Sequence, residues 1–171
     1  MGSLDQLYQQ VILDHYREKH GFGMREPGTG TRTAQSHQLN PLCGDEVTVR
    51  VALGRTGADD VVQDVSWVGD GCSISLASTS TLHDLVVGET TSEAGALVGA
   101  FRAMVRARGA AEPDEELLGD AAAFVGVGRH ANRVKCAMLG WTAFEDALKR
   151  AVVDGQLSPG GSTVSDDEET A

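Results

Sequence analysis

Three cysteines are the residues of this chain best suited to chemistry, and each lies in a distinctive local sequence. Cys43 lies between an Asn-Pro turn and Asp45. Cys72 follows Gly-Asp-Gly, and Cys136 follows Arg-Val-Lys. An odd, small number of cysteines argues against a disulfide framework. Three thiols and one carboxylate would supply the four ligands of a tetrahedral metal ion. The same cysteines could equally be three small hydrophobic groups in a core, and the residues alone leave both interpretations open.

The surroundings of the three thiols favour the metal-binding interpretation when they are taken together. Gly44 permits tight curvature, so that Cys43 and Asp45 can point at one centre. Cys72 precedes a predicted helix, whose positive N-terminal end favours a thiolate. Cys136 has basic neighbours on a second predicted helix, and their charges favour a thiolate as well.

Composition narrows the class of protein. A length of 171 residues fits one domain with a proper core, and the apolar content of 41% is ordinary. The net charge of −11 argues against nucleic acid as a partner. No apolar stretch approaches the roughly 20 residues of a membrane span, and no secretory signal is visible. We therefore expect a cytoplasmic, reducing location, where free thiols are normal.

The elements that must position the thiols can be predicted from periodicity. Apolar residues recur at helical spacing over residues 4–17, and residues 21–41 are expected to form a long loop. Clean alternation over residues 45–53 predicts a strand, which a hairpin returns over residues 61–68. Three further helices are expected: one after Gly71 capped by Ser73, one opening at Ser92 or Glu93, and one over residues 132–153.

The order of helix, hairpin and helices predicts an α+β fold. Residues 109–128 are acidic, rich in Ala and Gly and ambiguous, with a short helix expected near residues 113–118. Trp67 and Trp141 are expected in the core. Residues 155–171 have the composition of a disordered acidic tail, so the predicted domain covers residues 1–154.

Four ordered motifs give the chain a family resemblance. It resembles the SufU branch of the IscU/NifU-like iron–sulfur assembly proteins, and the matching segments span about residues 4–150 in the order of that family. The motifs are residues 7–8 with 11–16 (LY and VILDHY), 40–45 (NPLCGD), 69–75 (GDGCSIS) and 133–137 (RVKCA).

The resemblance implies a small antiparallel β-sheet packed on helices and a metal site of Cys43, Asp45, Cys72 and Cys136. The implied ion is Zn²⁺, and the implied partner is a PLP-dependent, SufS-type cysteine desulfurase that holds sulfur as a persulfide. By the same resemblance Cys43 is the acceptor, freed from zinc when a histidine of the partner replaces it. The sulfur would then pass to the downstream SUF assembly machinery. The chain would act as a sulfurtransferase rather than as a self-sufficient enzyme.

Two alternatives use the same residues. A scaffold could assemble a [2Fe–2S] cluster on them, because thiolates also ligate iron. A zinc-stabilised interaction module would do no chemistry. In the IscU proteins a histidine precedes the third cysteine, where this chain has Lys135, and residues 128–134 replace their chaperone-binding motif. These departures favour sulfur transfer over the scaffold.

Other polar residues have weaker claims. Arg133 is a candidate for contact with the partner, although it could equally be an ordinary surface arginine. The five histidines show no i, i+4 metal pair on one helix. His15 lies in a family motif and is expected to pack or form hydrogen bonds. His37 and His130 lie in predicted loops near the presumed site.

Overall fold

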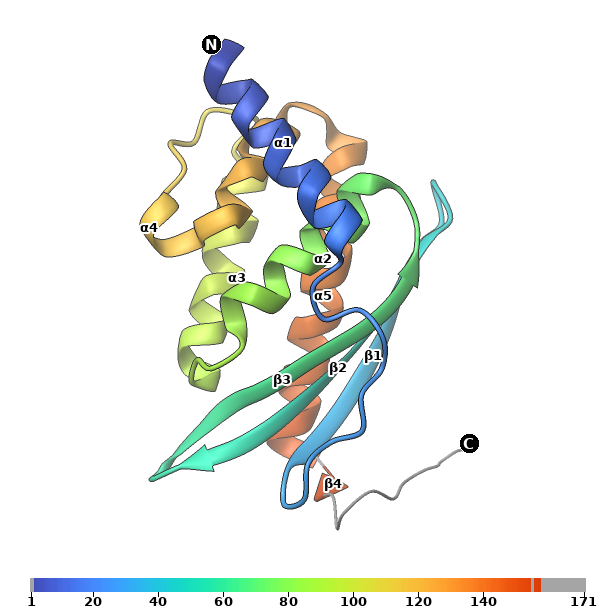
Figure 1. Ribbon diagram of the computed structural model, residues 1–171, viewed down its shortest axis with the longest axis vertical. Coiled ribbons are helices and arrows are strands. Elements are labelled where there is room, and N and C mark those ends of the chain that lie inside the picture. Colours follow the sequence, from blue (N-terminus) through green and yellow to red (C-terminus); the bar gives the residue numbers. More distant parts are fainter. Residues whose placement is uncertain (1, 155, 158–171) are drawn as a thin grey trace.

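The structure, a computed structural model, describes residues 2–154 and 156–157. It has an α+β architecture, as the order of the predicted elements indicated. One layer is an antiparallel sheet and the other is made of helices (Figure 1). In chain order the elements are α1 (Gly2–Glu18), β1 (Arg32–Asn40), β2 (Asp45–Thr56), β3 (Asp59–Asp70), α2 (Ser73–Val86), α3 (Thr91–Arg106), α4 (Glu115–Leu118), the 3₁₀ helix η1 (Gly119–Arg129), α5 (Ala131–Asp154) and β4 (Gln156–Leu157).

The sheet has the strand order β3-β2-β1-β4, with every neighbouring pair antiparallel. Val47, Val49 and Val51 of β2 are fully buried, whereas Thr48 and Arg50 between them are partly exposed. This alternation is what a strand with one covered face requires, because successive side chains point to opposite faces.

The register of the sheet places the ends of three strands side by side. Asn40 at the end of β1 pairs with Asp45 at the start of β2. Glu46 pairs in turn with Asp70 at the end of β3. The β1–β2 turn and the β3–α2 junction, which carry Cys43 and Cys72, therefore lie at one end of the sheet.

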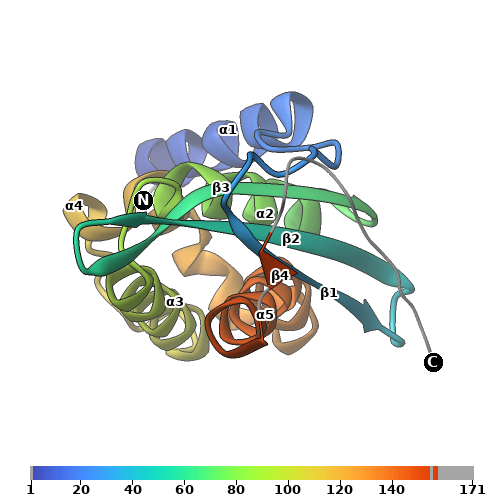
Figure 2. The same ribbon diagram turned by 90° about the horizontal axis from the view of Figure 1, so that it is seen from below.

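Helices cover the buried face of the sheet. In Figure 2 α5 runs beneath β1 and β2 with α3 beside it, and α1 lies over α2. The core between these layers contains Trp67 and Trp141, both fully buried as expected. Phe101 of α3 stacks on Trp141 with ring centroids 4.0 Å apart.

Hydrogen bonds and close packing of small residues join α2 to α5. The Ser78 hydroxyl donates to the Ala137 carbonyl at 2.7 Å and accepts from Trp141 Nε1 at 2.9 Å. Gly140 faces Thr79 so closely that a Cβ on the glycine would lie 2.1 Å from the Thr79 Oγ1. The position of α5, and hence of Cys136 upon it, depends on this close contact.

Some expectations for the elements are wrong in detail. Residues 21–41 are not a loop throughout, because β1 occupies Arg32–Asn40. Its sequence RTAQSHQLN lacks the apolar alternation that would predict a strand. β1 is a strand because it pairs with β2 along its whole length. Ser73 does not cap α2. The N-cap is Cys72, and its side chain makes no capping hydrogen bond.

The remaining helices agree closely with the periodicity. α1 and α5 begin and end within two residues of the expected bounds, and α3 opens with a capping box formed by Thr90 and Glu93. The ambiguous stretch contains α4 and η1.

Of the predicted tail, the structure describes only Gln156 and Leu157, which pair with the start of β1. The division at residue 154 stays a prediction.

None of the described helices combines the length and the apolar composition that crossing a membrane would require.

Candidate metal centre

A tight turn between β1 and β2 presents Cys43. The Gly44 N–H donates to the Asn40 carbonyl at 2.8 Å, and the Asn40 side chain accepts from the Leu42 N–H at 3.1 Å. Gly44 has a φ of +76°, a conformation that residues with a Cβ rarely adopt. Cys43 is exposed on this turn, and the chain then enters β2 at the buried Asp45.

Cys72 lies where β3 passes into α2. It is the N-cap residue of that helix and is exposed, and its Sγ lies 3.6 Å from the Ser75 Oγ. The unpaired N–H groups of a first helical turn carry partial positive charge, which stabilises a thiolate there.

Cys136 lies near the start of α5 and is only 8% exposed. Its Sγ is 3.7 Å from that of Cys43. Burial raises the pKa of Cys136, and the nearby sulfurs of Cys72 and Cys43 raise it further. The metal-free protein therefore keeps this thiol protonated, and a cation beside it would favour the thiolate.

The Asp45 carboxylate is held among the three thiols. It accepts a hydrogen bond of 2.6 Å from the buried Ser75 hydroxyl, as well as bonds from Cys72 and Cys43. Burial raises the pKa of Asp45, but these hydrogen bonds outweigh burial and leave that pKa below its ordinary value. Asp45 therefore stays ionised, as a metal ligand must.

The four expected ligands are brought together. The ligand atoms of Cys43, Asp45 and Cys136 lie within 4.8 Å of one another, and Cys72 adjoins both Asp45 and Cys136. Two zinc–sulfur bonds of about 2.3 Å that meet at the tetrahedral angle would give an edge of about 3.8 Å between their sulfurs. The sulfur separation of 3.7 Å between Cys43 and Cys136 matches that edge, so the donor set fits a zinc ion.

Two residues support the site without being expected to do so. A Cβ on Gly71 would lie 2.8 Å from Cγ of Asp45 and 3.0 Å from its Oδ1, so only glycine leaves room for the carboxylate. Ser75 orients Asp45 and is fully buried. Both lie in the motif of residues 69–75, but nothing in that motif indicates contact with a residue 26 or more positions earlier.

The basic and imidazole residues near the site are peripheral. Arg133 is exposed in the first turn of α5, where it lines a cavity of about 400 Å³ together with Tyr8, Ile12 and Ile74. Lys135 is exposed as well. Among the described residues His37 and His130 do not join the ligand group, and His37 instead pairs with Glu46 at 2.8 Å.

Comparison with known proteins places the chain in a family. Residues 7–151 match the family described as the NifU-like N terminal domain. This chain belongs to that family. The match covers all three cysteines and Asp45, and it confirms the resemblance inferred from the motifs.

Relatives of this NifU-like chain carry two kinds of name. The zinc-dependent sulfurtransferase SufU of Bacillus subtilis is 34% identical over 150 residues, covering 87% of this chain and 94% of that protein. The iron–sulfur cluster assembly scaffold protein IscU of Streptococcus pyogenes is also 34% identical, over 151 residues and 88% of each chain.

A solved structure resembles the NifU-like chain in fold as well. It is a protein from Fervidobacterium islandicum described as an iron–sulfur cluster assembly scaffold for the SUF system, with 31% identity and a TM-score of 0.60. The similarity covers 81% of this chain and 93% of that one. The family is therefore one of iron–sulfur cluster assembly, but the names divide between scaffold and sulfurtransferase.

Proposed function

We propose that this chain is a zinc-dependent sulfur acceptor in iron–sulfur cluster assembly, taking persulfide sulfur from a PLP-dependent cysteine desulfurase on Cys43. The observation that carries the proposal is the unequal presentation of the ligands. Cys43 is exposed on a glycine-containing turn, whereas Asp45 and Cys136 are buried behind it. Cys72 is exposed too, but it is fixed at the first turn of α2. Cys43 is therefore the sulfur that a second protein can reach and that the chain can move.

The proposed reaction is a thiol–disulfide type of exchange. The Cys43 thiolate attacks the outer sulfur of a persulfide on the desulfurase. A new sulfur–sulfur bond forms at Cys43, the bond inside the partner's persulfide breaks, and the partner's cysteine leaves as a thiolate. No external oxidant or reductant is needed, because the sulfane sulfur is transferred without a net change in the number of electrons.

Zinc fits the donors, and Cys43, Asp45, Cys72 and Cys136 are the residues that would hold it. When bound, Zn²⁺ supplies positive charge that keeps thiols in their thiolate form. The residues around it contribute the rest. Ser75 holds Asp45 in place, and the room left by Gly71 allows the carboxylate to approach.

The proposed partner is a SufS-type desulfurase in the cytoplasm, where thiols stay reduced. We propose that Arg133 contacts it, because this arginine is exposed beside the cavity three residues before Cys136. The sulfur would pass from Cys43 to the downstream SUF machinery.

The test is alanine production by a purified cysteine desulfurase in the presence of reductant. The full chain should accelerate alanine release, and the Cys43→Ala and Cys43→Ser variants should lose that acceleration, because neither can accept sulfur. Gly95→Ala, in open space on α3, is the matched control and should behave as the unaltered chain does. Mass spectrometry of the trapped intermediate should find one added sulfur atom on Cys43. Unchanged stimulation by both Cys43 variants would refute the acceptor role.

The alternative is a scaffold that assembles a [2Fe–2S] cluster on the same ligands, which the name of the Streptococcus pyogenes relative supports. Metal analysis and the visible spectrum of protein purified without oxygen separate the two. Sulfur transfer predicts a colourless protein that contains zinc. A coloured protein with bound iron and sulfide would favour the scaffold.

A further inference from the structure

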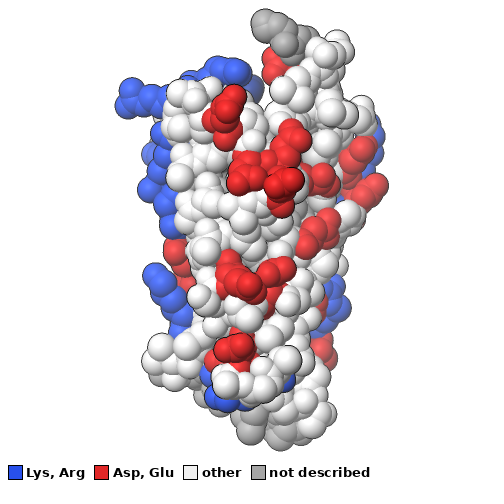
Figure 3. Space-filling view, turned by 90° about the vertical axis from the view of Figure 1, so that its left-hand side faces the viewer, with Lys and Arg blue, Asp and Glu red and all other residues white. Residues whose placement is uncertain are grey.

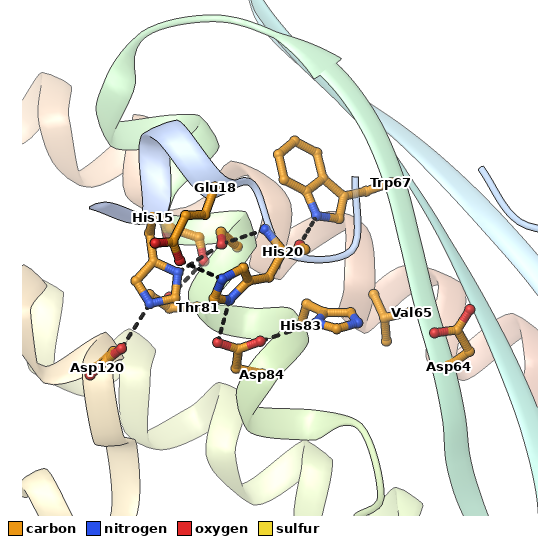
Figure 4. Close-up of polar contacts among 12 residues, drawn as sticks. His15, Glu18, His20, Asp64, Val65, Trp67, Thr81, His83, Asp84 and Asp120 are labelled. Carbon is orange, nitrogen blue, oxygen red and sulfur yellow. Dashed lines mark hydrogen bonds and ion pairs between the residues drawn. The ribbon is translucent and has the colours of Figure 1, made fainter. Parts of the chain in front are cut away.

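A second group of metal-ligating side chains lies apart from the cysteines. It consists of His15 near the end of α1, His20 just after α1, and Asp84 in α2, with ligand atoms within 4.8 Å of one another. Figure 4 shows the two imidazoles side by side above the carboxylate, and their ring centroids are 4.8 Å apart. The sequence gives no sign of this group, because its members are separated by up to 69 positions.

The hydrogen bonds of His15 determine which ring nitrogen carries the proton and which has the lone pair. His15 Nε2 lies 2.8 Å from the Asp120 carboxylate, which can only accept, so Nε2 carries the proton. His15 Nδ1 lies 2.7 Å from the Ser80 hydroxyl, which already accepts from the His20 N–H at 2.8 Å. The serine therefore donates to the Nδ1 lone pair, and a cation would bind there in place of that hydroxyl hydrogen.

His20 differs from His15, because both of its ring nitrogens face carboxylates and therefore both donate. Its Nε2 lies 2.7 Å from the Glu18 carboxylate, and its Nδ1 lies 2.6 Å from Oδ2 of Asp84. The other oxygen of Asp84, Oδ1, lies 3.2 Å from Nδ1 of His83. One nitrogen of each imidazole in the pair is thus held by an outer carboxylate, and the other contacts Ser80 in His15 and Asp84 in His20.

This is how proteins orient histidines that bind metal. A ligating imidazole almost always donates its second N–H to a carboxylate, a carbonyl or water, which fixes the ring and raises its basicity. Here Asp120 accepts the hydrogen bond from His15. Glu18 accepts the corresponding bond from His20.

The negative charge of the carboxylates around the two histidines favours binding of a cation. Glu18, Asp84 and Asp120 are all acidic, and within residues 2–154 their ion pairs are to histidines and to no lysine or arginine. Figure 3 shows acidic side chains gathered over the neighbouring face that carries α3 and α4. The side chains of His20 and Asp84 are 35% and 43% exposed, so an ion can reach them from solvent.

We propose that His15 Nδ1, His20 Nδ1 and Asp84 form a second divalent-cation site, of the class that takes Zn²⁺, separate from the proposed thiolate centre of Cys43, Asp45, Cys72 and Cys136. Two imidazoles and a carboxylate suit zinc, with bonds of about 2.0–2.2 Å and a fourth position for water. The ion takes the place of the proton between His20 and Asp84, and that proton is released to solvent. A tetrahedron with bonds of about 2.1 Å has edges of about 3.4 Å. The separation of 2.6 Å between His20 Nδ1 and Asp84 would therefore widen, and the longer separations, up to 4.8 Å, would shorten.

The test is the zinc content of untagged, full-length protein after equilibrium dialysis against Zn²⁺. The unaltered chain should hold two zinc ions, and the His20→Gln and Asp84→Asn variants should hold one. A triple Cys→Ser variant at positions 43, 72 and 136 should retain one ion, on the histidine site. His37→Gln is the matched control, because it also removes an imidazole paired with a carboxylate, and it should leave the content at two.

A further variant tests the outer carboxylate. Asp120→Asn should weaken zinc binding at the histidine site by about 10–100-fold without removing the ion at saturating zinc. Circular dichroism checks that each variant is folded. Independently of any variant, nitrogen-15 spectra of the unaltered chain should show the His15 and His20 imidazoles shifting when the second equivalent of Zn²⁺ is added, while His37 does not shift.

Two results would overturn the proposal. One is a chain that takes up no zinc beyond the thiolate centre at any concentration up to about 100-fold excess over protein, with the His15 and His20 signals unmoved. The other is a second equivalent that binds equally well to His20→Gln and Asp84→Asn. Both are independent of the desulfurase assay, so the sulfur-acceptor proposal could fail while this one stands.

Discussion

At the scale of single residues, the proposed ligands of the thiolate centre differ in how far solvent reaches them. Cys43 and Cys72 are exposed, whereas Asp45 and Cys136 are buried at 4% and 8% exposure. The sequence distinguishes these residues only through a family resemblance, because local pattern does not report burial. Their convergence could be anticipated, but the different accessibility of the sulfurs required the structure.

This difference predicts an order of alkylation. In metal-free native protein, iodoacetamide should modify Cys43 and Cys72 first and Cys136 last, because Cys136 is buried and burial raises its pKa. Peptide mass spectrometry at successive times measures the order. In denaturant the three rates should become similar. Native-state modification of Cys136 as fast as that of Cys43 would contradict the placement of Cys136.

The residues that position Asp45 were harder to predict from the sequence than the proposed ligands themselves. Gly71 and Ser75 act on Asp45, which lies on another strand, and the three come together only through the register of β2 with β3. The histidine cluster is an extreme case, since its hydrogen bonds join residues 64, 65 and 105 positions apart. Local spacing carries no information about contacts of that range.

At the scale of elements, the contact between α2 and α5 determines where Cys136 lies. Gly140→Ala should therefore destabilise the chain, because the added Cβ would lie 2.1 Å from Oγ1 and 2.9 Å from Cβ of Thr79. Overpacking of this kind costs about 1–3 kcal/mol. Urea denaturation measures the change in the free energy of unfolding.

Gly95→Ala is the control for that helix contact. Gly95 is inside α3 with nothing within 4 Å of an added Cβ, so alanine should stabilise the chain by about 0.5–1 kcal/mol through helix propensity alone. Equal effects of the two substitutions would show that α2 and α5 are not closely packed at Gly140.

Elements with a regular apolar period were predictable, and those without one were not. β2 alternates cleanly and α5 repeats at helical spacing, so both were expected near their observed bounds. β1 was missed because its inward residues, such as Ser36 and Asn40, are polar although buried. η1 was missed because GDAAAFVGVGR gives no consistent period, and tertiary packing of Phe124 and its neighbours fixes that segment.

At the scale of the whole molecule, the proposed zinc ion would join three segments distant in sequence. They are the β1–β2 turn, the β3–α2 junction and the start of α5. A ligand that binds only the folded state adds stability in proportion to the logarithm of its concentration over its dissociation constant. The thiolate centre should therefore stabilise the entire fold, since its donors come from both layers.

Zinc removal should accordingly lower the thermal midpoint of unfolding. At free zinc about 1,000 times the dissociation constant, the ion contributes about 4 kcal/mol, which a chelator would remove. The Asp84→Asn background isolates the thiolate centre from the histidine site. Scanning calorimetry of that variant with and without chelator measures the loss. A thermal midpoint that does not respond to the chelator would contradict zinc binding by the cysteines.

The cysteines and the last described residue lie at opposite ends of β1, which defines two poles of the molecule. The thiols gather beyond Asn40, whereas the last described residue, Leu157, pairs with Arg32 at the other end of the same strand (Figure 1). Nine residues of antiparallel strand span about 27 Å. A surface or a reporter domain attached beyond Leu157 would therefore hold the molecule by its far pole and leave the sulfur-bearing pole facing outward. Single-molecule and immobilised-partner measurements should be built from that side, because an attachment at α1 would begin next to the cavity that Arg133 lines.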